Sequence, residues 1–215
     1  MEKARVTWFL AAVGGALALF AGTPESSAQA RHGLDRPGFS VGLGATVGLP
    51  DFDLDSFEAR AGEGMEQNES FGFDVRAGYR LARSLAVEAN FQYHDEFGID
   101  FDGGGKAAEA NIWTLTANLK PYFVPDAEPL SGRLQVYGVV GGGLVWAEVD
   151  GFRGGVGIAR DELEFVGRFG AGADVYMTDR IALFGEYVYH LPTEDLVDFR
   201  FGSTAFGVRF VFPSG

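Results

Sequence analysis

Charged side chains recur at alternate positions in otherwise apolar segments of the chain, as Asp74, Arg76 and Arg80 do within residues 70–81. The charged residues that alternation places on the polar faces of these segments are Asp74, Arg76, Arg80, Glu88, Lys120, Glu164, Arg168, Asp174, Glu186 and Arg209. Acidic and basic members balance, and buried charges require partners of opposite sign. We therefore predict a structural charge network that plugs the interior of the fold. A narrow ion path through the same residues is the alternative.

Two histidines, His94 and His190, are the other candidates for acid–base chemistry. An imidazole acts as a general base when a serine and a carboxylate are arranged around it. No serine lies two residues from either histidine, and spacing alone assembles no triad. We therefore expect both histidines to lie at the outer ends of strands, on the surface or the rim, and we predict no catalytic residues.

The segment Asp51–Asp55 resembles the opening of a calcium-binding loop. Its sixth position is Ser56 instead of glycine and its twelfth is Gly62 instead of glutamate, so the match is incomplete. A solvated acidic loop is the expected structure, with weak divalent binding as the alternative. The glycine-rich run 102–106 lacks the following helix of a phosphate site. With no cysteine in the chain, thiolate metal sites are excluded, and we predict no metal and no cofactor.

The elements that position these residues are strands, because apolar and polar residues alternate with a period of two. The clearest example is residues 164–189, two alternating runs joined by a turn at Thr178–Asp179. In this hairpin Arg168 and Glu186 point the same way from neighbouring strands. In residues 134–147 we favour Val140 outward and Tyr137 inward, and the opposite register stays open. The eight expected strands are 37–48, 70–81, 84–93, 109–123, 134–147, 164–176, 181–190 and 199–212.

Polar faces that carry paired charges, opposite faces rich in phenylalanine and leucine, and an even number of strands indicate a polar interior within an apolar exterior. Short turns alternate with longer connections, and we expect loops at 49–69, 95–106, 148–160 and 191–198, of which the first, second and fourth are acidic. Lipid accepts a sheet only when it closes on itself. The predicted fold is therefore all-β, an eight-stranded antiparallel up-and-down transmembrane β-barrel, too narrow for an open pore once side chains fill it.

Residues 1–30 have the pattern of a secretory signal peptide, with Lys3 and Arg5 before an apolar run and Ala28 and Ala30 in a cleavage motif. We expect cleavage after Ala30, leaving residues 31–215 as the barrel domain; an uncleaved membrane anchor is the alternative. The net charge of −13 makes nucleic acid a poor partner.

The hairpin sequence from Gly170 through Tyr176 to Leu183, the run Asn118–Phe123 and the phenylalanine-rich last strand resemble the small outer-membrane β-barrel proteins of Gram-negative bacteria, the eight-stranded relatives of the OmpA membrane domain, OmpX and the opacity proteins. The resemblance covers residues 37–212. Such barrels end on an aromatic residue that the assembly machinery recognises, whereas here Pro213, Ser214 and Gly215 follow Phe212.

The resemblance implies a monomer in the cell outer membrane, delivered by the barrel-assembly machinery and surrounded by membrane lipids and lipopolysaccharide. The acidic loops would meet lipopolysaccharide phosphates through divalent cations. The function expected is structural, envelope-stabilising or adhesin-like, without enzyme activity. The alternatives are a lipid A-modifying enzyme, a narrow porin and a soluble lipocalin-like binder in the periplasm.

Overall fold

The computed structural model describes residues 37–51, 65–101, 106–123, 133–153, 156–193 and 200–213. The expected signal peptide and its cleavage site at Ala28 and Ala30 lie outside these residues. The strands of the described part are β1 (Gly38–Pro50), β2 (Met65–Gln67), β3 (Ser70–Ala82), β4 (Leu85–Phe101), β5 (Lys106–Phe123), β6 (Leu134–Arg153), β7 (Val156–Tyr176), β8 (Ile181–Pro192) and β9 (Phe201–Pro213).

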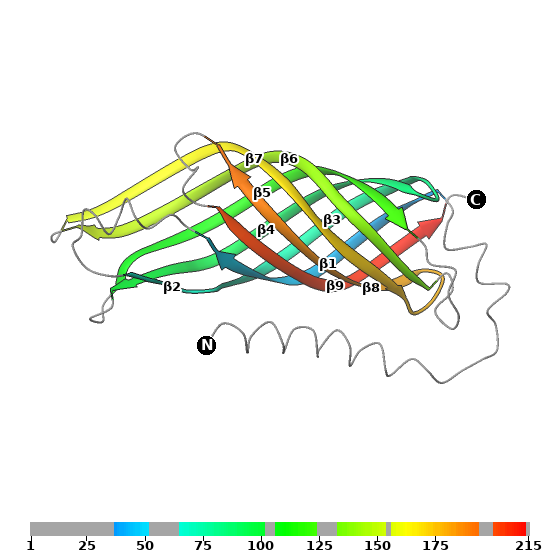
Figure 1. Cartoon of the computed structure of the whole chain (residues 1–215), viewed down its shortest axis with the longest axis horizontal. Coiled ribbons are helices and arrows are strands. Elements are labelled where there is room, and N and C mark those ends of the chain that lie inside the picture. The colour runs from blue at the N-terminus through cyan, green and yellow to red at the C-terminus, as the bar shows by residue number, and fades with distance from the viewer. Residues whose placement is uncertain are drawn as a thin grey trace.

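The strands form one closed antiparallel barrel (Figure 1). Around the wall the order is β4-β3-β1-β9-β8-β7-β6-β5, and β5 pairs with β4 to close the ring. The short β2 adds to the outer part of β4, where Met65 pairs with Phe101. The predicted fold class, with eight strands in the wall, is confirmed. Among the described residues no helix is long and apolar enough to cross a membrane.

The side chains are sorted as the alternation predicted. Leu43 and Phe71 on the outside are 61% and 67% exposed, whereas the guanidinium-bearing Arg76 and the Lys120 side chain inside are 1% and 0% exposed. In β6 the favoured register is confirmed, since Tyr137 is buried and Val140 is exposed. An apolar outer surface over a charged interior is the reverse of a water-soluble protein, which excludes the lipocalin-like alternative.

Two expected loops are largely strand. The segments expected as loops at 95–106 and 148–160 instead prolong β4, β5, β6 and β7, and Figure 1 shows these strands extending well beyond the ends of β8 and β9. Glu109 pairs with Asp150, and Glu148 with Asp161, so the ladders run continuously between neighbours. Polar sequence indicated loops, but backbone pairing between adjacent strands satisfies the same N–H and C=O groups in water.

The barrel has a turn end and a loop end. At the turn end the chain reverses at residues 83–84 and 177–180; at the loop end it leaves β1 and β8 at Asp51 and Thr193. In the 177–180 turn it is Thr178 whose hydroxyl oxygen accepts bonds from the N–H groups of Arg180 (3.2 Å) and Ile181 (3.1 Å).

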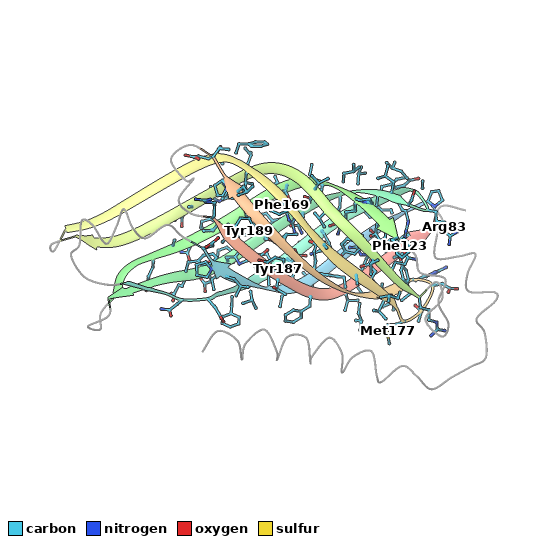
Figure 2. All side chains as sticks on the ribbon, viewed as in Figure 1. Arg83, Phe123, Phe169, Met177, Tyr187 and Tyr189 are labelled. Carbon is cyan, nitrogen blue, oxygen red and sulfur yellow. The ribbon has the colours of Figure 1, made fainter. Side chains whose placement is uncertain are left out.

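Aromatic rings gather on the lipid-facing surface toward both ends. Toward the loop end, Tyr93 lies 5.2 Å from Trp113, which stacks on Trp146 at 6.1 Å between ring centroids. At the turn end Phe39 lies 6.3 Å from Phe212, and Figure 2 shows Phe123 near the same end. Aromatic girdles of this kind mark the two membrane interfaces of a barrel.

Candidate functional site

The centre of the barrel interior is organised around Glu186 on β8. Its Oε1 accepts from Arg168 Nη2 at 2.8 Å, and its Oε2 lies 3.1 Å from Arg76 Nη1 and 2.7 Å from Lys120 Nζ. These cations come from β7, β3 and β5, so the contacts tie distant parts of the wall together. The Glu186 carboxylate therefore pairs with three cations inside the barrel, where the inward-facing side chains of the strands meet.

Glu88 on β4 is the second acidic centre. Its Oε1 lies 2.7 Å from Lys120 Nζ and 3.7 Å from Arg76 Nη1, and its Oε2 accepts from Arg209 Nη1 at 2.8 Å. Lys120 and Arg76 are shared between the two glutamates. Because every one of these side chains is nearly inaccessible to solvent, the contacts are of the fully buried type, in which loss of one partner is costly.

Two aspartates extend the cluster toward the ends of the barrel. Asp74 accepts from Arg76 Nε at 2.7 Å on Oδ1, and from Asn90 (2.8 Å) and Gln92 (2.9 Å) on Oδ2. Asp174 lies 3.4 Å from Arg209 Nε toward the turn end. We define the ion-paired cluster as these four carboxylates and four cations, which cancel in charge: Asp74, Glu88, Asp174, Glu186, Arg76, Lys120, Arg168 and Arg209.

Aromatic rings and a glycine, which has no side chain, shape the space around the cluster. The Arg76 guanidinium lies 3.9 Å above the Phe184 ring, and Lys120 Nζ lies 4.2 Å from the Tyr137 ring centroid. A Cβ at Gly42 would approach Arg76 Cγ to 2.6 Å. The glycine thus gives the arginine stem room to cross the interior.

Two predicted site residues lie apart from the ion-paired cluster. Arg80, near the turn end, donates to Gln135 Oε1 at 2.5 Å and to the carbonyl of Arg83 at 2.7 Å, and it stacks 4.0 Å from the Tyr122 ring. Glu164 shares the polar face of β7 with Arg168 but lies four residues nearer the loop end and is half-buried. The remaining predicted charges belong to the cluster.

The prediction missed the neutral polar residues that complete the network. Asn90 bridges Asp74 and Arg168, accepting a short hydrogen bond from Arg168 Nη1. Thr116 accepts from the same nitrogen at 3.2 Å. Asn90 lies on the same polar face of β4 as Glu88, and Thr116 on the same polar face of β5 as Lys120. A prediction that included amides and hydroxyls on these faces, and not charged residues alone, would have found them.

The two histidines are inside the barrel, and their expected rim or surface position is wrong. His94 and His190 are both 0% exposed. For His94 the expectation failed because β4 continues beyond it to Phe101. His190 does lie two residues before the end of β8, but the stacked ring of Phe201 covers it. His190 Nε2 lies 3.2 Å from Ser203 Oγ, and Ser203 donates to Gln92 Oε1 at 3.3 Å.

The remaining sequence candidates contribute little to the described site. Of the calcium-like segment 51–55 only Asp51 is described; it is exposed and accepts a short hydrogen bond from the Tyr189 hydroxyl. The run 102–105 lies outside the described residues. Among the described residues, no group of three or more acidic, histidine or cysteine side chains is arranged to hold a metal ion.

A closed membrane barrel with an ion-paired interior is the class of protein that these features define. The family model of the outer membrane protein β-barrel domain matches residues 14–212. The chain therefore belongs to the outer-membrane β-barrel family, and it is a protein of the outer membrane.

Solved structures share this fold. Neisserial surface protein A matches with a TM-score of 0.55 and 18% identity, over 81% of this chain and 97% of that one. The attachment invasion locus protein Ail of Yersinia pestis gives 0.52 and 18%, over 81% and 99%. OprG of Pseudomonas aeruginosa gives 0.53 and 16%, over 84% and 98%. A search of the curated proteins finds no match.

Proposed function

We propose that this protein is a sealed outer-membrane barrel whose work is done at its loop end, as an envelope-stabilising or adhesin-like surface protein without enzyme activity. The observation that carries the proposal is the ion-paired cluster, in which Glu88 and Glu186 hold cations from four strands across the interior. Such a cluster leaves the barrel rigid and closed, so the parts available to partners are its ends and its lipid-facing wall.

The loop end is the more suitable contact surface. The segment 49–69 contains seven acidic residues against Arg60 alone. Toward the same end, β5 reaches back to Lys106 and β6 extends to Arg153, well beyond Trp113 and Trp146. We place this end outside the cell, next to lipopolysaccharide, with divalent cations bridging its carboxylates to lipid phosphates. Ail, a structural neighbour, is described as an attachment protein and has been crystallised with a heparin analogue.

The geometry around His190 argues against a lipid A-modifying enzyme. A serine hydrolase needs a carboxylate on the second nitrogen of its histidine, whereas His190 Nδ1 has no hydrogen-bond partner among the described residues and the Ser203 hydroxyl donates to Gln92. Both side chains are also 0% exposed inside the barrel. A lipid in the surrounding membrane has no route to them.

The test compares a strain lacking the gene with the same strain carrying it. We expect the strain lacking the gene to be more sensitive to chelator and to large hydrophobic antibiotics, or to attach less to host-type surfaces. The mass of its lipid A should be unchanged. The purified barrel in planar bilayers at pH 7.5 should give no steady conductance. A changed lipid A mass would support the enzyme instead, and steady conductance would support the porin.

A further inference from the structure

Four rings close the interior above the ion-paired cluster on the side of the loop end. His190 stacks on Phe201 with centroids 4.4 Å apart and planes 7° apart. His94 meets Phe201 edge-on at 5.4 Å and Phe97 at 5.5 Å, and Phe97 lies 5.5 Å from Phe201. We call these four residues the histidine–phenylalanine cap; all are 0% exposed.

An irregularity in β4 builds this cap. Strict alternation would send His94 and Phe97 to opposite faces, but the pairing of β4 with β5 shifts between them, and Glu96 has a φ of 48°. A bulge of this kind re-aims the side chains that follow it, so Phe97 points inward beside His94. Gly48 on β1 leaves room for the ring, since a Cβ there would lie 2.3 Å from Phe97 Cζ.

The histidines are poorly satisfied in this layer. Both ring nitrogens of His94, and Nδ1 of His190, have no hydrogen-bond partner among the described residues. Buried polar groups without partners cost stability, and charged ones cost far more. The layer can therefore hold two neutral imidazoles but is unsuited to an imidazolium.

The charged groups around the histidines offer no stabilising acceptor. His94 faces Asp74 from β3 and Arg168 from β7, and His190 faces Arg168, His94 and Glu186 of its own strand. Both oxygens of Asp74 and of Glu186 are already engaged by donors within the ion-paired cluster. Arg168 would repel a cation.

We infer that the histidine–phenylalanine cap is an acid-opened seal, closed by neutral His94 and His190 and opened when both take up protons. The open state exposes the outer part of the interior to water, while the ion-paired cluster below keeps its contacts. A hydrated imidazole has an ordinary pKa of about 6.5. If a histidine is protonated only in the open state, the ratio of open to closed molecules rises about tenfold for each pH unit below its pKa. Two such histidines raise the ratio about 100-fold per pH unit.

The chain contains no cysteine, so a single introduced thiol can report on the seal. Thr114 on β5 is 0% exposed and pairs with Gln92, two residues before His94, which places it directly below the cap. Thr193 is exposed at the same end. A small neutral thiol reagent is applied to Thr114→Cys and, as the control for reagent and thiolate chemistry, to Thr193→Cys, between pH 7.5 and 5.0.

We expect the ratio of the two labelling rates to be low at pH 7.5 and to rise with a slope approaching two decades per pH unit below about 6.5. Replacing either histidine by glutamine should reduce the slope to about one decade per pH unit. Replacing both histidines should make the ratio independent of pH. A pH-independent ratio in the protein with both histidines, or an acid-induced rise that survives their double replacement, would overturn the inference.

Because glutamine in the cap could disturb folding, the same question is put to the protein without substitutions. Ring nitrogen resonances of His94 and His190 are followed by NMR together with amide hydrogen exchange at Phe201. Protonation and faster exchange should share one midpoint. Protonation without faster exchange would show that the cap tolerates charge while closed, which contradicts an acid-opened seal.

Discussion

Lys120 on β5 and Glu186 on β8 belong to strands that are not neighbours in the wall, yet Lys120 Nζ lies 2.7 Å from Glu186 Oε2. The contact spans the interior and joins parts of the barrel that no backbone ladder connects. Since Lys120 also contacts Glu88 at 2.7 Å, a single ammonium group links three strands. The interior therefore acts as a cross-brace for the wall.

The first prediction concerns this brace. Glu186→Ala leaves three cations without their shared carboxylate, and losing one partner of a buried pair costs about 3–5 kcal/mol. The urea midpoint of the barrel in lipid vesicles should fall accordingly. Glu148→Ala, at an exposed position on β6, should change stability by less than about 0.5 kcal/mol.

A double variant sharpens that test. Lys120→Met in the Glu186→Ala background removes one of the uncompensated charges, so the two effects should be less than additive. The prediction is wrong if the stability losses of Glu186→Ala and Lys120→Met simply add, or if Glu186→Ala and Glu148→Ala have the same urea midpoint. Either result would mean that water screens the charges of the interior.

The second prediction concerns the lipid-facing wall. Leu119 is exposed on β5 between Trp113 and Phe123, which lie at the two girdles. Leu119→Arg should destabilise the inserted barrel by about 2–4 kcal/mol, because arginine at the bilayer midplane is costly, whereas Phe71→Arg near the loop-end interface should cost only about 0–1 kcal/mol. Equal folding yields of the two variants in vesicles would refute this placement in the membrane.

The third prediction compares two glycines. A Cβ at Gly143 on β6 would lie 2.0 Å from the carbonyl oxygen of Leu115, whereas a Cβ at Gly185 on β8 would meet nothing within 4 Å. Gly143→Ala should cost about 1–3 kcal/mol through overpacking, and Gly185→Ala should be neutral or slightly stabilising. Thermal unfolding in detergent measures both; indistinguishable variants would mean that the wall yields at Gly143.

The fourth prediction concerns sidedness. Thr193 and Asp179 are exposed at the loop end and the turn end. A membrane-impermeant maleimide should label Thr193→Cys in intact cells, and Asp179→Cys only after the outer membrane is broken. The reverse pattern would place the loop end in the periplasm and would also remove the proposed contact with lipopolysaccharide.

The sequence by itself determined which side chains of most strands face inward. Backbone pleating sends successive side chains to opposite faces, so the local pattern was enough to place Arg76, Lys120 and Glu186 on one polar face. The apolar outer face, the two tight turns and the even number of strands then required a closed barrel in lipid. All of this depends on neighbours in the chain.

The tertiary structure decided what depends on the stagger of strands around the barrel. Which carboxylate Lys120 meets is set by the tilt and shear of the closed wall, and no local pattern encodes them. The burial of His94 depends on the length of β4 beyond it, and the inward turn of Phe97 depends on the bulge at Glu96. These features arise because distant strands meet across the interior, where a one-residue change in register exchanges the two faces of a strand.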